Sequence, residues 1–469
     1  MRPCRHTCKT CGMTCDLQQK ILAFDCLVPR YTSYPTAPHF KAIDNSKDVY
    51  EQRLHGLPHG TNLSLYLHTP YCAKMCHYCG CHTKITQRYA PVEDYIHLMM
   101  REIDMLGDQV PNHCTVSHIH FGGGSPGMIR ACDFEKIMHR LRRNFAILND
   151  AEIAIEIDPR GLTEGRVATY AATGVNRISL GVQDFNDRVL QAVNREQPFS
   201  WSYNAVNLLH EYGIDDISFD LLYGLPYQTA DTIADTVEKA LLLSPQRISL
   251  FGYAHVPWMK KHMRLIDEKT LPSKDARLAM FTLAGRKLIE AGYQAIGIDH
   301  FAKPDDPLAI AAQNGTLRRN FQGYTTDDAP AMIGIGASSI GECADGYIQN
   351  CVDIPLYKKA ILGSQLPAAK YTTHTADDLF RRDIIHGLMC DLSVNLIDIC
   401  KRHGHDITVL SNEINDLRIY EDAGLISYDP AAGQLTVHAD ARPITRVIAA
   451  IFDTYLDRAA TQPKHAKAI

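Results

Sequence analysis

The sequence predicts an α/β fold built around a parallel β-sheet. Six short runs rich in β-branched and aromatic residues alternate with longer stretches of helical periodicity, which is the pattern that βα units produce. The six expected strands are residues 63–69, 117–122, 153–158, 177–182, 216–221 and 247–253. Each run ends in polar residues or glycine, so these residues lie on the loops where barrel enzymes place their sites. The pattern alone fits either an open six-unit barrel or a doubly wound sheet.

Length and composition exclude several classes of protein. The 469 residues suffice for two or three domains with sizeable cores. A net charge of -5 provides no general basic field, so nucleic-acid binding is not indicated. No apolar run approaches the roughly 20 residues that span a bilayer, and the start M-R-P-C-R-H-T-C lacks the apolar core of a secretory signal. We therefore expect a cytoplasmic protein without a membrane partner, whose 15 cysteines bind metal or stay as free thiols.

Three cysteines directly after the first expected strand are the strongest chemical signal. Cys72, Cys76 and Cys79 have the spacing C-x3-C-x2-C, which lets one short loop present three thiolates to three irons of a small cubic cluster. Four cysteines close an ordinary electron-transfer cluster, whereas a metal centre that does chemistry keeps one position open for its substrate. S-adenosylmethionine can fill that position through its amino and carboxylate groups. A zinc knuckle is the alternative, although zinc sites usually pair C-x2-C with a second Cys/His pair.

The segment around these cysteines, Y-L-H-T-P-Y-C-A-K-M-C-H-Y-C-G-C at 66–81, resembles the oxygen-independent coproporphyrinogen III oxidases of the radical S-adenosylmethionine superfamily. The cysteine spacing indicates only the superfamily. The narrower resemblance depends on Cys81 in C-G-C, on P-R-Y-T-S-Y-P-T-A at 29–37 and on R-N-F-Q-G-Y-T-T at 319–326. It extends from about Pro29 to near the C-terminus and implies a partial (β/α)6 TIM-like barrel.

The resemblance and the sequence pattern together divide the chain into four parts. We expect a Cys-rich tail at 1–28, a substrate-covering segment at 29–60, the barrel at 61–361 and a smaller domain at 362–469. The last part is mostly helical. Within it, residues 410–429 and 433–438 are typical of a helix followed by two short strands, a winged-helix-like arrangement. Acidic residues occupy the helix where a DNA-binding protein would need basic ones, so we interpret this domain as a cover for the barrel mouth.

The N-terminal tail carries four further cysteines, Cys4, Cys8, Cys11 and Cys15, outside the family resemblance. Four closely spaced thiols could close a zinc or iron-sulfur site. Chain termini are commonly disordered, so a tail without metal is the simpler interpretation.

The resemblance implies that two S-adenosylmethionine molecules bind at the strand ends. The residues matched to the cluster-bound molecule are Tyr66, Gly123, Glu156 and Ile340. The residues matched to the second molecule are Tyr78, Gly124, Ser125, Gln183, Arg195, Asp220 and Ala254. These residue types suit the task, because glycine lets the backbone approach a ligand and a guanidinium binds a carboxylate with a planar fork of donors. Tyr66 and His68 are the candidate catalytic residues, although a buried histidine is commonly structural.

The activity that the resemblance implies is an anaerobic radical reaction. A reduced [4Fe-4S] cluster cleaves S-adenosylmethionine, and the resulting radical removes a hydrogen atom from each of two propionates of coproporphyrinogen III. Loss of carbon dioxide and an electron then leaves the two vinyl groups of protoporphyrinogen IX. We also expect a low-potential electron donor of the flavodoxin or ferredoxin type, and a monomer.

Two other activities occur on the same fold. A haem chaperone typically shows aromatic residues where this chain has Gly80 and Cys81. A radical methyltransferase would use the second S-adenosylmethionine as a methyl donor, and the Y-T-S-Y-P-T-A and R-N-F-Q-G-Y-T-T segments weigh against it.

Overall fold

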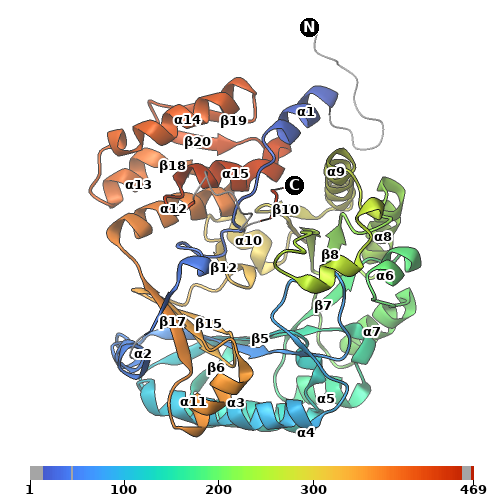
Figure 1. Cartoon of the computed structure of the whole chain (residues 1–469), viewed down its shortest axis with the longest axis vertical. Helices are drawn as coiled ribbons and strands as arrows, with labels where there is room; N and C mark the ends of the chain where they lie inside the picture. Colours follow the sequence, from blue (N-terminus) through green and yellow to red (C-terminus); the bar gives the residue numbers. More distant parts are fainter. Residues whose placement is uncertain (1–13, 44–45, 457–465, 469) are drawn as a thin grey trace.

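A sheet of 13 strands forms the centre of the computed structural model, which describes residues 14–43, 46–456 and 466–468. Six parallel strands stand side by side in chain order (Figure 1): β2 (Asn62–Thr69), β5 (Thr115–Gly123), β6 (Ala146–Ile157), β7 (Arg177–Gln183), β8 (Asp216–Tyr223) and β9 (Arg247–Gly252). They coincide with the six expected strands. The sheet does not close on itself, because its strand order begins at one edge with β1 and ends at the other with β10, so the prediction of a partial barrel is confirmed.

Helices follow the parallel strands and cover the outside of the sheet. They are α3 (Ala90–Gln109), α4 (Ala131–Asn144), α5 (Glu164–Ala172), α6 (Asp187–Ala192), α7 (Phe199–Glu211), α8 (Ala230–Leu242) and α9 (Lys274–Glu290). In α3 the residues Val92, Ile96, Met99, Ile103 and Leu106 are buried at intervals of three or four residues, the spacing of a single apolar helix face. This face packs on the strands, so the other face of the sheet is left to line the lumen.

Further strands extend both edges of the sheet. On one side β14 (Ala331–Ile335) pairs parallel with β2, and antiparallel strands continue from it: β15 (Ile340–Cys343), β16 (Gly346–Asn350), β17 (Ala368–Thr373) and β1 (Lys41–Ala42). On the other side β11 (His300–Ala302) and β10 (Gln294–Ile296) are antiparallel. The sequence analysis did not anticipate these strands, which are short.

A smaller, mostly helical domain follows the sheet, as expected. Its elements are α12 (Ala376–Asp391), β18 (Ser393–Asn395), α13 (Leu396–Arg402), α14 (Ser411–Asp422), β19 (Ile426–Asp429), β20 (Gln434–Val437) and α15 (Thr445–Ala449). The three strands form one sheet in the order β18-β20-β19. Helix α11 (Ile354–Leu362) packs on α3, α10 (Pro307–Gln313) packs on β10, and the hairpin of β12 (Arg318–Asn320) and β13 (Gly323–Thr325) contacts α12 of this domain.

The N-terminal segment packs on the C-terminal domain. Helix α1 (Cys15–Ala23) places Phe24 against the Tyr420 ring of α14, with centroids 4.4 Å apart, and the two lie together in Figure 1. Ile21, Val28, Tyr31 and Tyr34 belong to the buried core of that domain. Cys15 begins α1, whereas Cys4, Cys8 and Cys11 lie outside the described residues.

The two chain ends pair with each other. The Val28 amide donates to the Ala466 carbonyl at 3.1 Å, and the Ala468 amide donates to Cys26 at 3.0 Å. Helix α2 (Ser46–His55) then leads back toward the sheet. None of the helices in the described ranges is both long and apolar enough to cross a membrane.

Candidate active site

The cysteine loop lies over the carboxyl ends of the parallel strands. Cys72 ends β3 (Tyr71–Cys72), which pairs with β4 (Lys84–Ile85), and the Cys79 amide donates to the Cys76 carbonyl at 3.1 Å. The loop borders a cavity of about 490 Å³. Besides the three cysteines, the expected site residues that line this cavity are Tyr78, Gly123, Gly124, Ser125, Glu156, Gln183, Arg195 and Asp220. The structure thus brings together strand ends and a thiol loop that are up to about 150 residues apart in the sequence.

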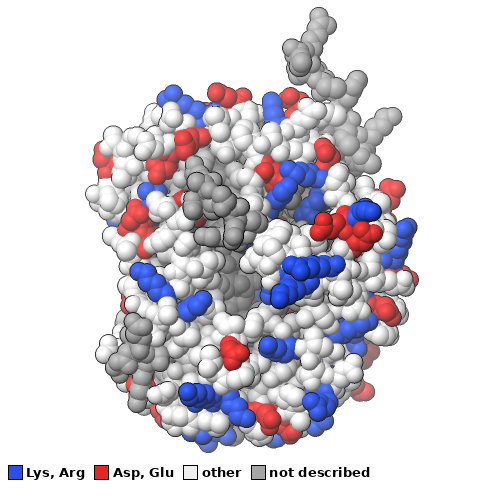
Figure 2. Space-filling view, in the orientation of Figure 1, with Lys and Arg blue, Asp and Glu red and all other residues white. Residues whose placement is uncertain are grey.

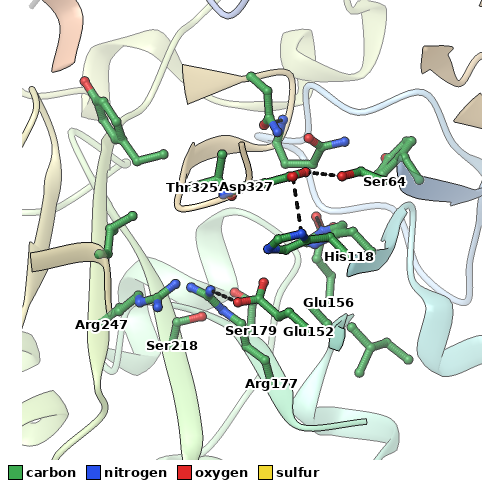
Figure 3. A pocket seen from close by; sticks show the side chains of 18 of the residues that line it. Ser64, His118, Glu152, Glu156, Arg177, Ser179, Ser218, Arg247, Thr325 and Asp327 are labelled. Carbon is green, nitrogen blue, oxygen red and sulfur yellow. Dashed lines mark hydrogen bonds and ion pairs between the residues drawn. The ribbon is translucent and has the colours of Figure 1, made fainter. Parts of the chain in front are cut away.

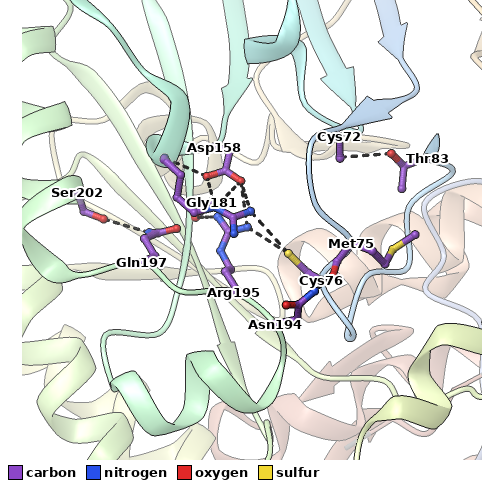
Figure 4. Close-up of polar contacts among 11 residues, drawn as sticks. Cys72, Met75, Cys76, Thr83, Asp158, Gly181, Asn194, Arg195, Gln197 and Ser202 are labelled. Atoms are coloured by element: carbon purple, nitrogen blue, oxygen red, sulfur yellow. Dashed lines mark hydrogen bonds and ion pairs between the residues drawn. The ribbon is translucent and has the colours of Figure 1, made fainter. Parts of the chain in front are cut away.

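Two arginines and a threonine donate to the cysteine sulfurs (Figure 4). Thr83 Oγ1 lies 3.3 Å from the Cys72 sulfur, and Arg195 Nη1 and Arg160 Nη2 lie 3.6 and 3.8 Å from the Cys76 sulfur. Asp158 balances the two guanidinium groups, at 2.6 Å from Arg160 and 3.4 Å from Arg195. Such donors stabilise thiolate charge and tune the potential of an iron-sulfur cluster.

The residues present fit a cubic cluster better than a single ion. Nowhere in the described ranges do three His, Cys, Asp or Glu side chains form a group that could hold one metal ion. In a [4Fe-4S] cluster each iron takes its own thiolate, so three cysteines on one loop need not converge on a point. The loop can therefore hold three irons of such a cluster with Cys72, Cys76 and Cys79.

Glu156 is fixed at the end of β6 by two donors. His120 Nε2 lies 3.0 Å from Glu156 Oε1, and the Gly123 amide donates to Oε2 at 3.4 Å. The backbone of β5 runs close to this carboxylate, because a Cβ on Gly122 would come within 2.8 Å of Oε1. The carboxylate keeps a free lone pair at the cavity wall and can accept a hydrogen bond from a bound amino group or hydroxyl.

Tyr66 and His68 form a hydrogen-bonded pair on β2. Tyr66 Oη lies 3.1 Å from His68 Nδ1, and His68 Nε2 lies 3.3 Å from the His82 carbonyl. Burial lowers the pKa of His68 to about 4, and burial and then Glu156 raise the pKa of Tyr66 well above its usual range. His68 is therefore neutral near pH 7. Since a carbonyl only accepts, Nε2 carries the proton and Nδ1 accepts from the Tyr66 hydroxyl.

The polar groups expected for a second ligand line the opposite wall. Ser179 Oγ donates to Asp220 at 3.2 Å, and burial followed by the nearby Glu156 charge raises the pKa of Asp220 to about 6. Gln183 has a φ of 72°, a left-handed conformation that is uncommon for a residue with a side chain. Arg195 donates to Gly181 and pairs with Asp158, while its Nε finds no acceptor in the described structure. One guanidinium edge therefore remains unsatisfied.

Four expected residues do not line this cavity, and one of them is His68, which is buried beside Tyr66. Tyr66 lines a neighbouring cavity of about 240 Å³ inside the sheet lumen, and Ala254 lines a third cavity of about 490 Å³ toward the C-terminal domain. Ile340 begins β15, next to the loop after β14. The lumen cavity shares Glu156 and Asp220 with the cluster cavity, so the two are contiguous.

The lumen cavity is strongly polar (Figure 3). Asp327 accepts from Ser64 and lies 3.2 Å from His118 Nδ1, and Arg177 pairs with Glu152 at 3.0 Å. Alternate residues of a strand point to one face, which explains how Glu152 and Glu156 of one strand both reach the lumen. An apolar barrel core would leave no room for a polar ligand here.

Sequence analysis missed Thr83, His120, Asp158 and Arg160. Asp158 and Arg160 lie within E-I-D-P-R at the end of the third expected strand, two and four residues after Glu156. The period of two in a strand was the signal that could have identified Asp158 beside Glu156. Thr83 carries no such signal, because its position depends on how the loop between Cys79 and β4 folds back.

The class of protein follows from this fold and site. The family model of the radical SAM superfamily matches residues 66–240 of the chain, which contain the cysteine loop and the strand ends described above.

Relatives define the family more narrowly. An oxygen-independent coproporphyrinogen III oxidase from Bradyrhizobium diazoefficiens is 45% identical over 430 residues, covering 92% of this chain and 95% of the relative. One from Helicobacter pylori is 38% identical over 432 residues, covering 91% and 94%. The solved coproporphyrinogen III oxidase (HemN) from Escherichia coli, described as a radical SAM enzyme, matches with a TM-score of 0.86 at 35% identity over 91% of this chain and 98% of that one. The chain belongs to the family of oxygen-independent coproporphyrinogen III oxidases.

Proposed function

We propose that this protein is an oxygen-independent coproporphyrinogen III oxidase that converts two propionates of coproporphyrinogen III to vinyl groups, yielding protoporphyrinogen IX for porphyrin biosynthesis. The observation that carries this proposal is the three-cysteine loop over a cavity lined by polar strand ends, in a chain that aligns along 92% of its length with a relative of that name. Neither the haem chaperone nor the methyltransferase is favoured, because relatives that cover 92% and 91% of the chain carry the oxidase name.

The protein's own residues bind, orient and shield the reactants. Cys72, Cys76 and Cys79 would hold a [4Fe-4S] cluster, which with S-adenosylmethionine supplies the radical that removes a hydrogen atom from the substrate. We assign Glu156 to accept from the polar end of the cluster-bound molecule, and the Gly123 amide, which donates to Glu156, to hold that carboxylate in position. The hydrogen bond from Tyr66 to His68 fixes both rings beside Glu156, so we assign them to positioning the reacting groups.

We further propose that the site binds a second S-adenosylmethionine, held by Gln183, Arg195 and Asp220 with Tyr78, Gly124 and Ser125. The free Nε of Arg195 and the Asp220 carboxylate support this proposal, because they form a second polar set that a single ligand against Glu156 would leave unused. Ile340 and Ala254, which do not line the cluster cavity, are assigned to the edges of the two molecules.

Equilibrium binding tests this division. Asp220→Ala removes a charge-assisted acceptor worth roughly 1.5–3 kcal/mol, so one of two sites should weaken roughly tenfold to more than a hundredfold. Asp215→Ala, which removes an exposed carboxylate just before β8, is the control. A wild type that binds one molecule, or a loss at the cluster-bound site instead, would contradict the proposal.

The reaction itself is tested by anaerobic incubation of reconstituted protein with coproporphyrinogen III and chromatography of the vinyl products. Cys76→Ala should abolish both product and 5'-deoxyadenosine, because one iron loses its thiolate. Cys132→Ala, on an exposed cysteine that does not line the cluster cavity, should leave both unchanged. Cluster-dependent cleavage by the Cys76 variant would refute the ligand assignment.

The remaining proposals concern the surroundings of the site. A low-potential flavodoxin or ferredoxin would deliver electrons, and the protein would act as a cytoplasmic monomer. We also propose the division of the chain into segments 1–28, 29–60, 61–361 and 362–469, the second and fourth of which cover the barrel mouth. Metal analysis of a chain lacking residues 1–13 would test whether Cys4, Cys8 and Cys11 bind metal, without cutting into α1.

A further inference from the structure

A third cavity, of about 490 Å³, lies between the sheet and the C-terminal domain and is strongly cationic. Five arginines and two lysines line it, against a single carboxylate, that of Asp299. The arginines come from the N-terminal segment, α9, β12, and the residues just before and within α15: Arg30, Arg277, Arg319, Arg442 and Arg446. Figure 2 shows Lys and Arg side chains on the face of the molecule seen in Figure 1. Such a concentration of one sign of charge binds anions.

Two of these arginines have unused donors. Arg319 Nε and Nη1 and Arg446 Nη1 are buried and have no hydrogen-bond acceptor in the described ranges. Arg319 Nη2 donates to the Arg30 carbonyl at 3.3 Å, and Arg446 Nη2 donates to the Lys467 and Ala468 carbonyls. None of the ion pairs found among the described residues includes either guanidinium. Arg319 also lies over the Tyr324 ring at 4.5 Å, but neither guanidinium has an acidic partner in the part of the chain that the structure describes. A buried charge without an ion pair is costly, so an anionic ligand would satisfy both groups.

Electrostatics support the same conclusion. Burial, followed by the like charges of Arg30 and Arg319, lowers the pKa of Arg446 to about 10. Asp299 is engaged elsewhere, since it lies 2.7 Å from His300 Nδ1. The cavity therefore holds more positive charge than its own carboxylate neutralises.

The walls of the cavity are aromatic. Tyr223, Phe251, Tyr253, Trp258, Phe281 and Phe321 line it. Aromatic walls with a few placed charges are typical of sites for a large apolar ligand. A single small anion such as phosphate would leave these walls uncovered, whereas an apolar ring with several carboxylates would use both features.

The cavity also leads toward the reacting groups. It shares Phe251 and Gln322 with the lumen cavity, which in turn shares Glu156 and Asp220 with the cluster cavity. A ligand anchored at Arg319 can therefore extend one arm past Phe251 toward the cofactors.

We propose that Arg319 and Arg446 bind carboxylates of the tetrapyrrole that are not reacting, and so set which propionate reaches the cofactor site. This inference rests on the proposed function, because it assumes a substrate with four carboxylates. The proposed carboxylate-binding subsite is formed by the β12 hairpin and the C-terminal domain. The domain then takes part in recognising the substrate besides covering the barrel.

The test uses the reconstituted holoenzyme and coproporphyrin III, the stable oxidised form of the substrate ring, in an anaerobic fluorescence titration. Arg319→Gln and Arg446→Gln should each weaken binding roughly tenfold to a hundredfold, since each loses a charge-assisted hydrogen bond. Arg318→Gln is the matched control, because Arg318 is the exposed neighbour of Arg319 on β12 and does not line the cavity. The affinity of the Arg318→Gln variant for coproporphyrin III should stay within about twofold of the wild type, which is less than the loss of one hydrogen bond would cause.

A second arm of the experiment separates recognition from folding. The tetramethyl ester of coproporphyrin has no free carboxylates. The wild type should therefore bind this ester about as weakly as a variant with both the Arg319→Gln and Arg446→Gln substitutions binds the acid. Neither substitution should weaken binding of the ester further. An equal loss for acid and ester, or acid affinity unchanged in both variants, would overturn the inference even if the enzyme makes vinyl products. A wild type that neither binds the ring nor converts the porphyrinogen would refute the proposed function instead.

Discussion

At the residue scale, Gly123 at the end of β5 leaves space for the His68 ring beside the cofactor site. Gly123 has a φ of 114°, and a Cβ at this position would come within 2.7 Å of the His68 ring. L-residues with side chains rarely adopt this conformation. Glycine is therefore required here both by the backbone angle and by the ring that Tyr66 holds in place.

Gly123→Ala should displace His68 and weaken the binding of S-adenosylmethionine. The left-handed conformation costs such a residue roughly 1–2 kcal/mol, which the variant avoids only by moving the backbone that donates to Glu156. We expect this displacement to lower the affinity by about tenfold. Equilibrium binding and 5'-deoxyadenosine formation measure the effect. Gly165→Ala in α5, where a Cβ meets nothing within 4 Å, should change neither, and equal behaviour of the two variants would contradict the steric argument.

The donor on Cys72 predicts an electrochemical effect. Thr83→Val removes the hydrogen bond to the Cys72 sulfur while keeping a similar shape. The thiolate charge of the reduced cluster is then less stabilised. The reduction potential should therefore fall by tens of millivolts, which corresponds to the free energy of about one hydrogen bond. Potentiometric titration followed by electron paramagnetic resonance measures the shift, and Thr83→Ser should restore the wild-type value. A potential that rises in the valine variant would contradict this role.

At the scale of elements, one buried carboxylate joins a helix to the loop that follows β14. Glu102 of α3 accepts from the Gly336 amide at 2.7 Å, from Asn350 Nδ2 at 2.7 Å and from Tyr357 Oη at 2.6 Å. The same loop leads into Ile340. Burial raises the pKa of Glu102 to about 7, so its protonation changes near neutral pH.

Glu102 should make stability fall as pH rises. The pKa of Glu102 in the folded state lies above its unfolded value of about 4.5. Between these two values the folded state binds a proton that the unfolded state has lost, so the free energy of unfolding falls by about 1.4 kcal/mol for each pH unit. This loss of stability is absent below about pH 4.5 and complete above about pH 7. Glu102→Gln should lose roughly 1–3 kcal/mol through one mismatched donor but lack this slope. Denaturant unfolding from pH 5 to 8 tests it, and parallel curves for both proteins would contradict the assignment.

The sequence predicts those elements whose residues form a recognisable pattern within one short segment. The six parallel strands are short runs in which apolar residues alternate with polar ones, because one face packs on the helices and the other lines the polar lumen. The C-x3-C-x2-C spacing lies in a single loop. Strands β14 and β15 were missed because they are short and glycine-rich, and only their pairing with β2 and β16 identifies them. The contacts of Arg195 could not be foreseen either, since Asp158 and Cys76 reach it from other elements.

At the scale of the whole molecule, the N-terminal segment contacts the C-terminal domain before its strand β1 pairs with β17 of the large sheet. Tyr31 donates to the Asp453 carboxylate at 3.0 Å, and the Tyr34 hydroxyl lies 3.1 Å from the Thr454 hydroxyl. Burial, and then Asp453, raise the pKa of Tyr31 well above its usual range. Tyr31 thus stays protonated and keeps donating.

Tyr31→Phe should destabilise the protein by roughly 1–3 kcal/mol, because it leaves a buried carboxylate with one donor fewer. A double-mutant cycle with Asp453→Asn, measured by denaturant unfolding, should show positive coupling between the two positions. Tyr212→Phe, which removes a hydroxyl bonded to Glu164 at an exposed position, should cost less than about 0.5 kcal/mol. Additive effects of the Tyr31 and Asp453 substitutions would contradict a direct contact.

The pairing of the two chain ends has a consequence for biosynthesis. Ile21, Val28 and Tyr31 are translated several hundred residues before their packing partners in the C-terminal domain. All six parallel strands and the cysteine loop are synthesised in between. Contacts this distant in sequence form late, so we expect the cysteine loop to be accessible to iron and sulfide before the C-terminal domain packs beside the sheet.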